Sequence, residues 1–468
     1  MVLLNRQKVY ISVLKSGNML GKIKPDSQQN LFKTRLTDLI NLRHPLVKLA
    51  DEVSWDKMEQ EFQNLYSEQG RPSIHIRKIA GLLLLKEMFN QSDESVVERW
   101  IENAYWQYFT GEEFFQTKQP FDPSEFVHFR KRLKEEGLEF LLSQSVALHP
   151  KAKKEKEVQI DTTVQEKNIT FPTDAKLAKK VIDNCTKIAE KEGIKQRQTY
   201  KRVAKQHLRD AYFGHHPKRR KKATMARKKL RTIGKRVVRE LERKLPEHLQ
   251  KQYETEFSNY KKALTQERNS KEKIYSLHEP QTACIAKGKA HKAYEFGTKV
   301  CVVRGRQTGV ITSVKRFSGN PHDSNTLEES LAQSERVRKH IGGTRPEIAG
   351  TDRGFRGETE VEGTQILITK NKKESSRYQQ DLARKRFRAR AAIEPTISHL
   401  KRNHALGLNF LKGVVGDIHN ALLAGIGYNF KLRFNQIKEQ IAFWLIKLFN
   451  LSTENNILIF VEIKKGSF

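Results

Sequence analysis

Cysteine is scarce in this sequence, which limits the kinds of site it can build. Only three of the 468 residues are cysteines, and Cys185, Cys284 and Cys301 are widely spaced. An odd number at such spacing indicates neither a disulfide framework nor a zinc cluster. We therefore expect a chain that needs no oxidising compartment to fold.

Long apolar runs are also missing. The start, "MVLLNRQKVYISVLKSGNML", is interrupted by Arg6, Lys8 and Lys15, which makes a poor signal peptide. The most apolar tail, "IAFWLIKLFNLSTENNILIFVEI", is broken by Lys447 and Glu454 and falls short of a membrane-spanning run. The sequence predicts a cytoplasmic protein with no membrane partner.

Acidic residues are outnumbered throughout the chain. The 54 Asp and Glu face 88 Lys and Arg, for a net charge of +34. Phosphate backbones are the natural counter-surface for such a charge. The excess peaks in residues 201–240, which hold 16 Lys and Arg against two acids. We expect this segment to track DNA phosphates, although a merely solvated helix stays open.

The basic segment contains one dense cluster of positive charge. Its members are Lys218, Arg219, Arg220 and Lys221. We expect these four side chains to bind DNA. His215 and His216 precede them without a third ligand, so we interpret the pair as part of the basic face rather than a metal site.

The length allows two or three domains, and the pattern changes along the chain. Residues 1–44 have no long period and are expected to form an arm. Residues 45–150 have helical spacing, including "DPSEFVHFRKRLKEEG", a helix expected to start at Pro123 and Ser124 and to end before Gly137. Such helices suit either a helix-turn-helix reader of DNA or an ordinary helical bundle.

The alternation of strand and helix patterns in residues 151–440 predicts a mixed α/β domain. "EVQIDTTVQ" is a β-branched strand expected to end near Asp161, and a basic helical insertion follows at about 174–275. "YEFGTKVCVVRG" and "GVITSVKRF" predict a hairpin. The strands "EIAGTD" and "TQILITK" and a long helix from "GDIHNALLAG" complete the alternation. Residues 441–468 are expected to form a C-terminal tail.

Three acids stand out by position: Asp161 and Asp352 on predicted strands, and Glu394 in "RFRARAAIEPTISHLKRNHALG". If they converge on one edge of the sheet, they suit two Mg²⁺ or Mn²⁺ ions, which prefer carboxylate, water and phosphate oxygens. Two such ions can support an in-line phosphoryl displacement. On the residues alone, surface charges or helix caps remain the alternative for each acid.

Helical spacing adds two cations to this group. Arg390 and Lys401 are four residues before and seven residues after Glu394, which places them on its helix face if the helix is continuous. Pro395 either opens a new helix or kinks an existing one. Asp323, in "GNPHDSNTL", is a rival second carboxylate, but its position before a helix favours an N-cap.

Several motifs together resemble a known family: "QIDTTVQEKNITFPTD", "SLHEPQTACIAKGKAHKAYEFGTKV", "GNPHDSNTL", "TDRGFRG" and "IEPTISHLKRNHALGLNFLKG". They are similar to DDE transposases of bacterial insertion sequences, in particular the insertion-sequence-five family. The resemblance runs from about residue 44 to 430. It implies a ribonuclease-H-like catalytic core behind a helical DNA-binding front domain.

The resemblance also implies roles for individual residues. Asp161, Asp352 and Glu394 would be catalytic metal ligands. A Tyr, Arg, Glu, Lys signature of related enzymes falls on Phe387, Arg390, Glu394 and Lys401, with Phe387 replacing the tyrosine and its hydroxyl.

Further side chains are expected to touch DNA. Arg390 and Lys401 would contact phosphates near the scissile bond, and Arg353 and Arg402 would bind DNA beside them. Among the histidines, His291, His399 and His404 are candidates for phosphate contact, but not for catalysis.

These expectations define a DNA transposase. It would bind the inverted ends of its element, cleave there with metal-activated water, and transfer the freed 3′-hydroxyl to target DNA. A homodimer on double-stranded DNA and a nucleoid-associated cytoplasmic location follow from the resemblance. One alternative is an inactive DNA-binding protein derived from a transposase, and the unusual residues after Asn450 keep that alternative open. The other alternative is a generic nuclease.

Overall fold

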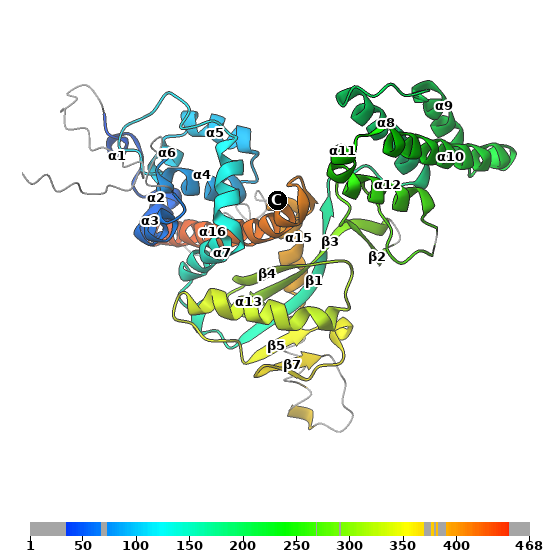
Figure 1. The fold of residues 1–468 in the computed structure, drawn as a ribbon. Coiled ribbons are helices and arrows are strands. Elements are labelled where there is room, and N and C mark those ends of the chain that lie inside the picture. Colours follow the sequence, from blue (N-terminus) through cyan, green and yellow to red (C-terminus); the bar gives the residue numbers. More distant parts are fainter. Residues whose placement is uncertain are drawn as a thin grey trace, which may run out of the picture. The chain divides into compact units, whose positions relative to one another are not determined.

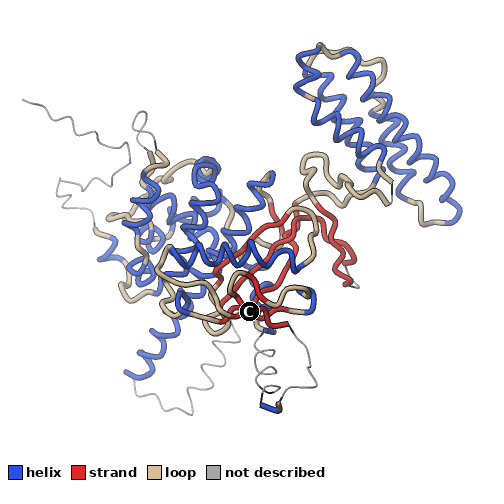
Figure 2. The backbone as a smooth tube through the Cα atoms, turned by 60° about the horizontal axis from the view of Figure 1, so that its bottom comes forward, coloured by secondary structure: helices blue, strands red, loops and turns tan. Residues whose placement is uncertain are grey.

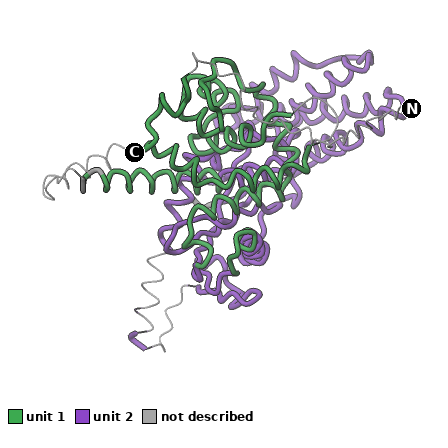
Figure 3. The backbone as a smooth tube through the Cα atoms, turned by 90° about the vertical axis from the view of Figure 1, so that its left-hand side faces the viewer, with its two compact units in different colours: residues 1–154, 337–344, 425–468 green, residues 155–336, 345–424 purple. Residues whose placement is uncertain are grey.

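The chain forms two compact units, which Figure 3 distinguishes by colour. One comprises residues 1–154, 337–344 and 425–468, and the other comprises residues 155–336 and 345–424. The structure, a computed structural model, describes residues 34–66, 73–267, 269–289, 292–368, 376–378, 381 and 390–448. No described helix combines the length and apolar character needed to cross a bilayer.

The first unit is helical, as predicted for residues 45–150. Its helices up to residue 154 are α1 (Leu36–Leu39), α2 (Pro45–Glu52), α3 (Trp55–Gln63), α4 (Ile76–Met88), α5 (Asp93–Glu102), α6 (Ala104–Phe109) and α7 (Glu125–Ala147) (Figure 1). Most of α4 is buried, so it forms the centre of this core. Ser92 caps α5 through a reciprocal pair of hydrogen bonds with Ser95, which satisfies backbone groups at the helix start.

The helix after Pro123 ends before Gly137, as predicted, because the chain leaves helical geometry at Lys134, which has φ 53°. A second helical segment, which we did not predict, contains Gly137 and continues to Ala147. Leu138, Leu141 and Leu142 are all fully buried beyond the glycine. The free energy gained by burying these leucines exceeds the cost of one glycine inside a helix, so this second helical segment is stable.

The second unit is built on an eight-stranded mixed sheet (Figures 1 and 2). Its strands are β1 (Glu157–Lys167), β2 (Ala283–Lys289), β3 (Lys292–Gly305), β4 (Ile311–Phe317), β5 (Ile348–Thr351), β6 (Glu360–Val361), β7 (Thr364–Ile368) and β8 (Leu408–Asn409). The main path is β2-β3-β1-β5-β7-β6, with β4 on β3 and β8 on β1. The pairs β1–β5 and β5–β7 are parallel, whereas β1–β3 and β3–β4 are antiparallel.

The first strand extends further than its sequence indicates. We expected it to end near Asp161, but β1 runs on to Lys167, so that prediction is wrong. The extension pairs with β3, whose antiparallel register reaches Glu166 opposite Gly297. The strand β2, which we did not predict from its small and basic residues, likewise forms by pairing with β3. The predicted hairpin of β3 and β4 is confirmed.

Helices pack on both faces of this sheet. On one face, Leu327 and Leu331 of α13 (Leu327–Lys339) form a core with Val158, Ile160 and Ala349 of the strands. Figure 1 shows α13 lying across the sheet. The helices α15 (Ile393–Asn403) and α16 (Gly413–Leu448) follow later in the chain, and α16 takes part in both units.

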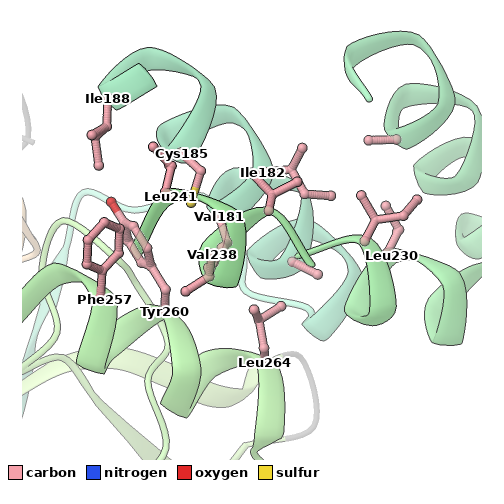
Figure 4. Packing of buried hydrophobic residues seen from close by; sticks show 14 of the residues in the cluster. Val181, Ile182, Cys185, Ile188, Leu230, Val238, Leu241, Phe257, Tyr260 and Leu264 are labelled. Carbon is pink, nitrogen blue, oxygen red and sulfur yellow. The ribbon is translucent and has the colours of Figure 1, made fainter. Parts of the chain in front are cut away.

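A helical insertion lies between β1 and β2, as predicted. It contains α8 (Asp174–Lys191), α9 (Lys201–Tyr212), α10 (Arg220–Lys244), α11 (Glu247–Gln252) and α12 (Glu254–Thr265). These helices have a hydrophobic core of their own, in which Ile182, Leu230 and Leu264 are buried (Figure 4). The insertion therefore holds its shape through its own packing.

A buried ion cluster joins the end of β1 to the start of α16. The Lys167 ammonium lies 2.6 Å from Asp417 Oδ1 and 3.2 Å from Glu279 Oε2. Asn409 of β8 donates to the same Asp417 oxygen at 2.7 Å. Burial raises the pKa of the Asp417 carboxyl, and the Lys167 ammonium opposes that rise. The cluster fixes β1, β8 and α16 relative to one another.

We predict that Lys167→Met strongly destabilises the second unit. Two buried carboxylates would lose their cation, which typically costs about 3–5 kcal/mol. Denaturant unfolding, followed by a probe in this unit, measures the loss. The matched control is Lys292→Met, which removes a solvent-exposed ion pair with Glu166 and should cost less than about 1 kcal/mol. Equal losses in the two variants would contradict a structural role for the buried cluster.

Candidate active site

The parallel pairing of β1 with β5 brings two of the predicted acids to the same end of neighbouring strands. The last registered pair is Gln159 with Gly350. Asp161 and Asp352 each follow two residues later, so they occupy equivalent positions on adjacent strands. The β1–β5 ladder stops before them, so the two aspartates follow the last paired residues of both strands.

Asp161 faces the side of the sheet opposite α13. Successive side chains of a strand alternate between faces, and Ile160 belongs to the core beneath α13. Gln165 shares the face of Asp161, and its amide donates to the Asp417 carbonyl of α16 at 3.1 Å. Asp161 itself is half-buried and accepts from the Thr162 backbone at 2.7 Å.

Asp352 is held by the turn that follows its strand. It lies at the N-cap of the short 3₁₀ helix η4 (Arg353–Phe355), where its Oδ1 accepts from the Gly354 N–H at 2.8 Å. Phe355 is fully buried in the core below, which anchors this turn to the sheet. The carboxylate is therefore fixed at the exit of β5.

Glu394 lies at the start of a new helix. α15 begins at Ile393, so Pro395 occupies the first turn, where its missing N–H costs no helical hydrogen bond. The helix packs on β1, the strand of Asp161. The Glu394 side chain is 66% exposed, and its Oε1 lies 3.8 Å from Arg390 Nη2. Arg390 precedes α15, so the helix is not continuous between these two residues, but their side chains still lie close together.

The prediction that Asp323 serves as an N-cap is wrong. The cap of the 3₁₀ helix η3 (Asp323–Thr326) is His322, whose side chain accepts from the Ser324 N–H. Asp323 Oδ1 instead accepts from Thr162 Oγ1 at 2.9 Å and lies 2.6 Å from Lys299 Nζ. Sequence reasoning missed Lys299 and Thr162, because only the fold brings them to Asp323.

Two of these carboxylates lie close to Gly354, which has no side chain. A Cβ built on Gly354 would lie 2.6 Å from Asp323 Oδ2 and 3.0 Å from Asp352 Oδ1. Both oxygens therefore approach Gly354 so closely that a side chain at this position would displace at least one of them. Carboxylate oxygens are the donors that Mg²⁺ and Mn²⁺ prefer.

The acids create a negative field within a strongly basic protein. Burial raises the pKa of the Cys301 thiol to about 12, and the carboxylates of Asp161 and Asp323 contribute to that rise. Among the described residues, no three His, Cys, Asp or Glu side chains are grouped closely enough to hold one ion. Mg²⁺, however, commonly uses one or two carboxylates and completes its shell with water and substrate phosphate.

The predicted DNA-binding cations around the acids differ in their surroundings. Arg353 and Arg402 are exposed. Lys401 Nζ instead lies 3.9 Å from Oε1 of the buried Glu295, which partly offsets its charge. The prediction that His404 is a candidate for phosphate contact is wrong, because only 3% of that residue is exposed.

Two further histidines and one aromatic residue complete this group. His399 is exposed and lies 3.2 Å from the side-chain nitrogen of Asn403. His291 and Phe387 lie outside the described residues.

The basic cluster of the insertion is on its surface. Lys218, Arg219, Arg220 and Lys221 are exposed, and so are His215 and His216 before them. The Arg219 guanidinium lies over the Phe213 ring at 4.9 Å. The buried side of α10 consists of residues such as Ala226 and Leu230, so its charged side faces solvent.

Comparison with known proteins identifies the class of protein that carries this site. A family model described as Transposase domain (DUF772) matches residues 34–132, and one described as Transposase DDE domain matches residues 273–423. "Uncharacterized protein ORF8 in nfe locus" of Rhizobium meliloti is 44% identical over 188 residues, which are 39% of this chain and 91% of that protein. No solved structure matches.

The chain belongs to the DDE transposases. Such enzymes act on DNA, and the DDE domain implies a nuclease and transposase activity that generally uses divalent metal ions. The DDE match contains Asp352 and Glu394 but begins after the insertion, so it does not reach β1. The pairing of β1 with β5 connects Asp161 to the matched region.

We predict that Gly354→Ala weakens binding of divalent ions. The new methyl group would push apart the Asp323 and Asp352 oxygens, and displacing groups around a metal typically lowers affinity by about 10–100-fold. Titration with Mn²⁺, followed by electron paramagnetic resonance of the free ion, measures the affinity. Gly350→Ala is the control, because its Cβ would meet only the Val158 carbonyl at 3.7 Å. Unchanged affinity in Gly354→Ala would contradict a metal-binding role for Asp352 as it is held in this turn.

Proposed function

We propose that this transposase binds the terminal inverted repeats of an insertion sequence, cleaves at the ends, and transfers the 3′-hydroxyl to target DNA. Membership of the insertion-sequence-five family is part of the proposal and rests on the motifs around Asp161, Asp352 and Glu394. The observation that carries it is the position of Asp161 and Asp352 at the same end of adjacent parallel strands. Ligands of α/β sheets commonly bind beyond the carboxyl ends of such strands.

The proposed core is ribonuclease-H-like. Its support is the antiparallel series β1, β3 and β4, with the parallel strands β5 and β7 on the other side of β1. In this proposal the helical insertion follows the first strand of the core, and the helices of residues 45–150 bind DNA.

The proposed metal ligands are Asp161, Asp352 and Glu394. Their carboxylates would hold two Mg²⁺ or Mn²⁺ ions together with water and phosphate oxygens. Such ions activate the attacking oxygen and stabilise the leaving one. Arg390, which lies 3.8 Å from Glu394, would orient that carboxylate and meet a phosphate oxygen. Arg353 would hold phosphate beside Asp352.

The proposed reaction consists of two steps, cleavage and strand transfer. In the first, a water oxygen attacks phosphorus at the element end, the bond from phosphorus to the 3′-oxygen breaks, and that oxygen leaves as a 3′-hydroxyl after taking up a proton. In the second, this hydroxyl attacks a target phosphorus, and a target 3′-hydroxyl is released. The second step conserves the number of phosphodiester bonds, so the protein needs to position the reactants rather than supply energy.

The basic cluster 218–221 is proposed to track DNA phosphates outside the reacting bond. Its support is the exposure of all four side chains and the low number of acids around them. Since two element ends must be joined to one target, we also propose that a homodimer assembles on DNA. We propose a nucleoid-associated cytoplasmic location on the same basis.

We predict that Asp352→Asn and Glu394→Gln abolish cleavage while DNA binding stays near normal. Metal stabilisation of the transition state is worth several kcal/mol, so the rate should fall by about a thousandfold or more. Mg²⁺-dependent nicking of a duplex carrying the element end measures the rate, and gel shift measures binding. Glu358→Gln, a change at an exposed acid six residues from Asp352, is the control.

A Glu394→Gln protein that cleaves at the wild-type rate would contradict the site assignment. Wild-type protein that binds element ends but never cleaves them with Mg²⁺ or Mn²⁺ would favour an inactive DNA-binding descendant. Cleavage without preference for the ends would favour a generic nuclease.

We also predict that replacing residues 218–221 with serine lowers DNA affinity and flattens its salt dependence. Each lost phosphate contact should reduce the slope of log affinity against log salt by about 0.9. Binding measured from low to high salt tests this. Serine at Lys251, Lys261 and Lys262 is the control, because each of these lysines lies beside an acid of the insertion. An unchanged slope would contradict phosphate contact by the cluster.

A further inference from the structure

Two aromatic side chains lie exposed in the turn between α9 and α10. Tyr212, the last residue of α9, is 74% exposed, and Phe213 after it is 41% exposed. The exposed residues that follow are His215, His216, Pro217 and the basic cluster 218–221. Exposed rings and exposed cations thus occupy one turn of the insertion.

Several contacts hold this turn in a fixed shape. Lys222 Nζ lies 3.0 Å from Asp210 Oδ1, and Arg227 Nη2 donates to the Ala211 carbonyl at 3.3 Å. Gly214 packs so closely against the same guanidinium that a Cβ at this position would collide with it. These contacts join the end of α9 to the first turns of α10. The chain on either side of the aromatic pair is therefore anchored, and the exposure of the pair is a property of the fold.

The two rings differ in their surroundings. The Arg219 guanidinium lies 4.9 Å from the centroid of the Phe213 ring. The Tyr212 ring packs against the same phenylalanine in a T-shaped arrangement, with the ring centroids 5.4 Å apart. Phe213 therefore supports Tyr212 from one side. Most of the Tyr212 ring stays in solvent, so the turn forgoes the free energy that burial of an aromatic side chain provides.

An incidental surface aromatic is the simpler interpretation of Tyr212. Single exposed apolar side chains are common and need no explanation. This interpretation accounts for the ring alone, but not for its position in so basic a segment. The two acids of residues 201–240 are Asp210 and Glu240, and each lies beside a lysine. A polyanion is the partner whose charge complements this surface.

Nucleic acid offers a partner for the cations and for the ring together. Proteins that bind single strands combine a positive surface that follows the phosphates with aromatic rings on which bases stack. In an intact duplex, neighbouring base pairs cover the faces of each base, and only its edges are open in the grooves. An unpaired base exposes its face. It is therefore the part of DNA on which an exposed tyrosine ring can stack.

We infer that Tyr212 stacks on an unpaired base of the DNA whose phosphates are bound by the basic cluster 218–221. The inference rests on the proposed function, because it adds a base contact to the proposed phosphate contact of the insertion. The turn then makes two kinds of contact that respond differently to salt. Cations on phosphates release counterions from DNA, whereas a stacked ring does not.

Binding of the full-length chain to a short DNA duplex with one unpaired 2-aminopurine tests this inference. The fluorescence of that base falls when it stacks, so one titration reports both affinity and stacking. Tyr212→Ala should lower the affinity by about 5–150-fold, the worth of one stacked base, and should remove the fall in fluorescence. Tyr212→Phe keeps the ring and should behave as the wild type does.

The matched control is Phe443→Ala. It removes another exposed aromatic ring, one that lies beside Glu439 and Gln440 of α16 rather than among cations. Its affinity and its fluorescence change should equal those of the wild type. Because both rings are exposed, neither change removes a buried contact, and thermal melting of each variant should match the wild type.

Salt and base pairing separate stacking from a further phosphate contact. Tyr212→Ala should leave the slope of log affinity against log salt unchanged, whereas serine at residues 218–221 should flatten it. The wild type should bind the fully paired duplex less tightly than the duplex with the unpaired base. A Tyr212→Ala protein that keeps wild-type affinity for the unpaired base, or that loses equal affinity for both duplexes, overturns the inference.

Sedimentation of the chain without DNA tests whether a second copy covers the ring instead. Tyr212→Ala should sediment as the wild type does. Dissociation of a wild-type dimer by this change would assign the ring to a protein interface and overturn the inference.

Serine at residues 218–221 distinguishes failure of this inference from failure of the proposed function. If the serine variant loses affinity for DNA while Tyr212→Ala keeps it, the proposed phosphate contact stands and Tyr212 is excluded from it. If neither variant loses affinity, the proposed DNA contact of the insertion is itself wrong.

Discussion

The parallel pairing of β1 with β5 is the constraint on which the rest of the site depends. The two strands are separated in sequence by the helical insertion and by β2, β3, β4 and α13. Their backbone ladder, packed beneath α13 through Val158 and Ala349, puts Asp161 and Asp352 at equivalent positions of adjacent strands. Because that ladder stops at Gln159 and Gly350, the strand ends separate where the acids begin. The same pairing thus places the two carboxylates at the same end of adjacent strands.

Charge is divided between separate parts of this basic protein. The excess of cations is concentrated on the exposed side of the insertion, where long-range attraction to a polyanion is useful. The strand ends hold acids instead, and the raised pKa of the Cys301 thiol, which is due mainly to burial, includes a contribution from the carboxylates of Asp161 and Asp323. Positive groups are present near the acids, but Lys299 and Lys401 each lie beside a carboxylate. This division suits an enzyme that must attract DNA and also bind cations.

Much of this arrangement was predictable from the sequence, and the failures have a common cause. The hydrophobic periods identified the helices of residues 45–150 and the hairpin of β3 and β4, since these depend on local patterns. The end of the first strand was misplaced at Asp161 because the long partner strand β3 extends it, and the helical segment after the break at Lys134 was missed because buried leucines stabilise it. Tertiary packing decided these boundaries, not propensity.

The geometry of the candidate site was even less predictable from local sequence patterns than the ends of the helices and strands. The motifs pointed to Asp161, Asp352 and Glu394, but their chain positions carry no distances. Asp323 has the sequence environment of a helix cap, and only the structure reveals its contacts with Thr162 and Lys299. Likewise, the close approach of Asp323 to Gly354 joins two segments that are distant in sequence. Convergence of this kind cannot be read from spacing along the chain.

Iron-mediated cleavage of the protein backbone tests the central claim most directly. Fe²⁺ substituted for Mg²⁺, with ascorbate and peroxide, generates radicals that cut the chain near the bound ion. The account predicts cuts close to Asp161, Asp352 and Glu394 in one protein, all suppressed by excess Mg²⁺. Cuts confined to one of these segments, or located elsewhere in the chain, would contradict a shared metal site.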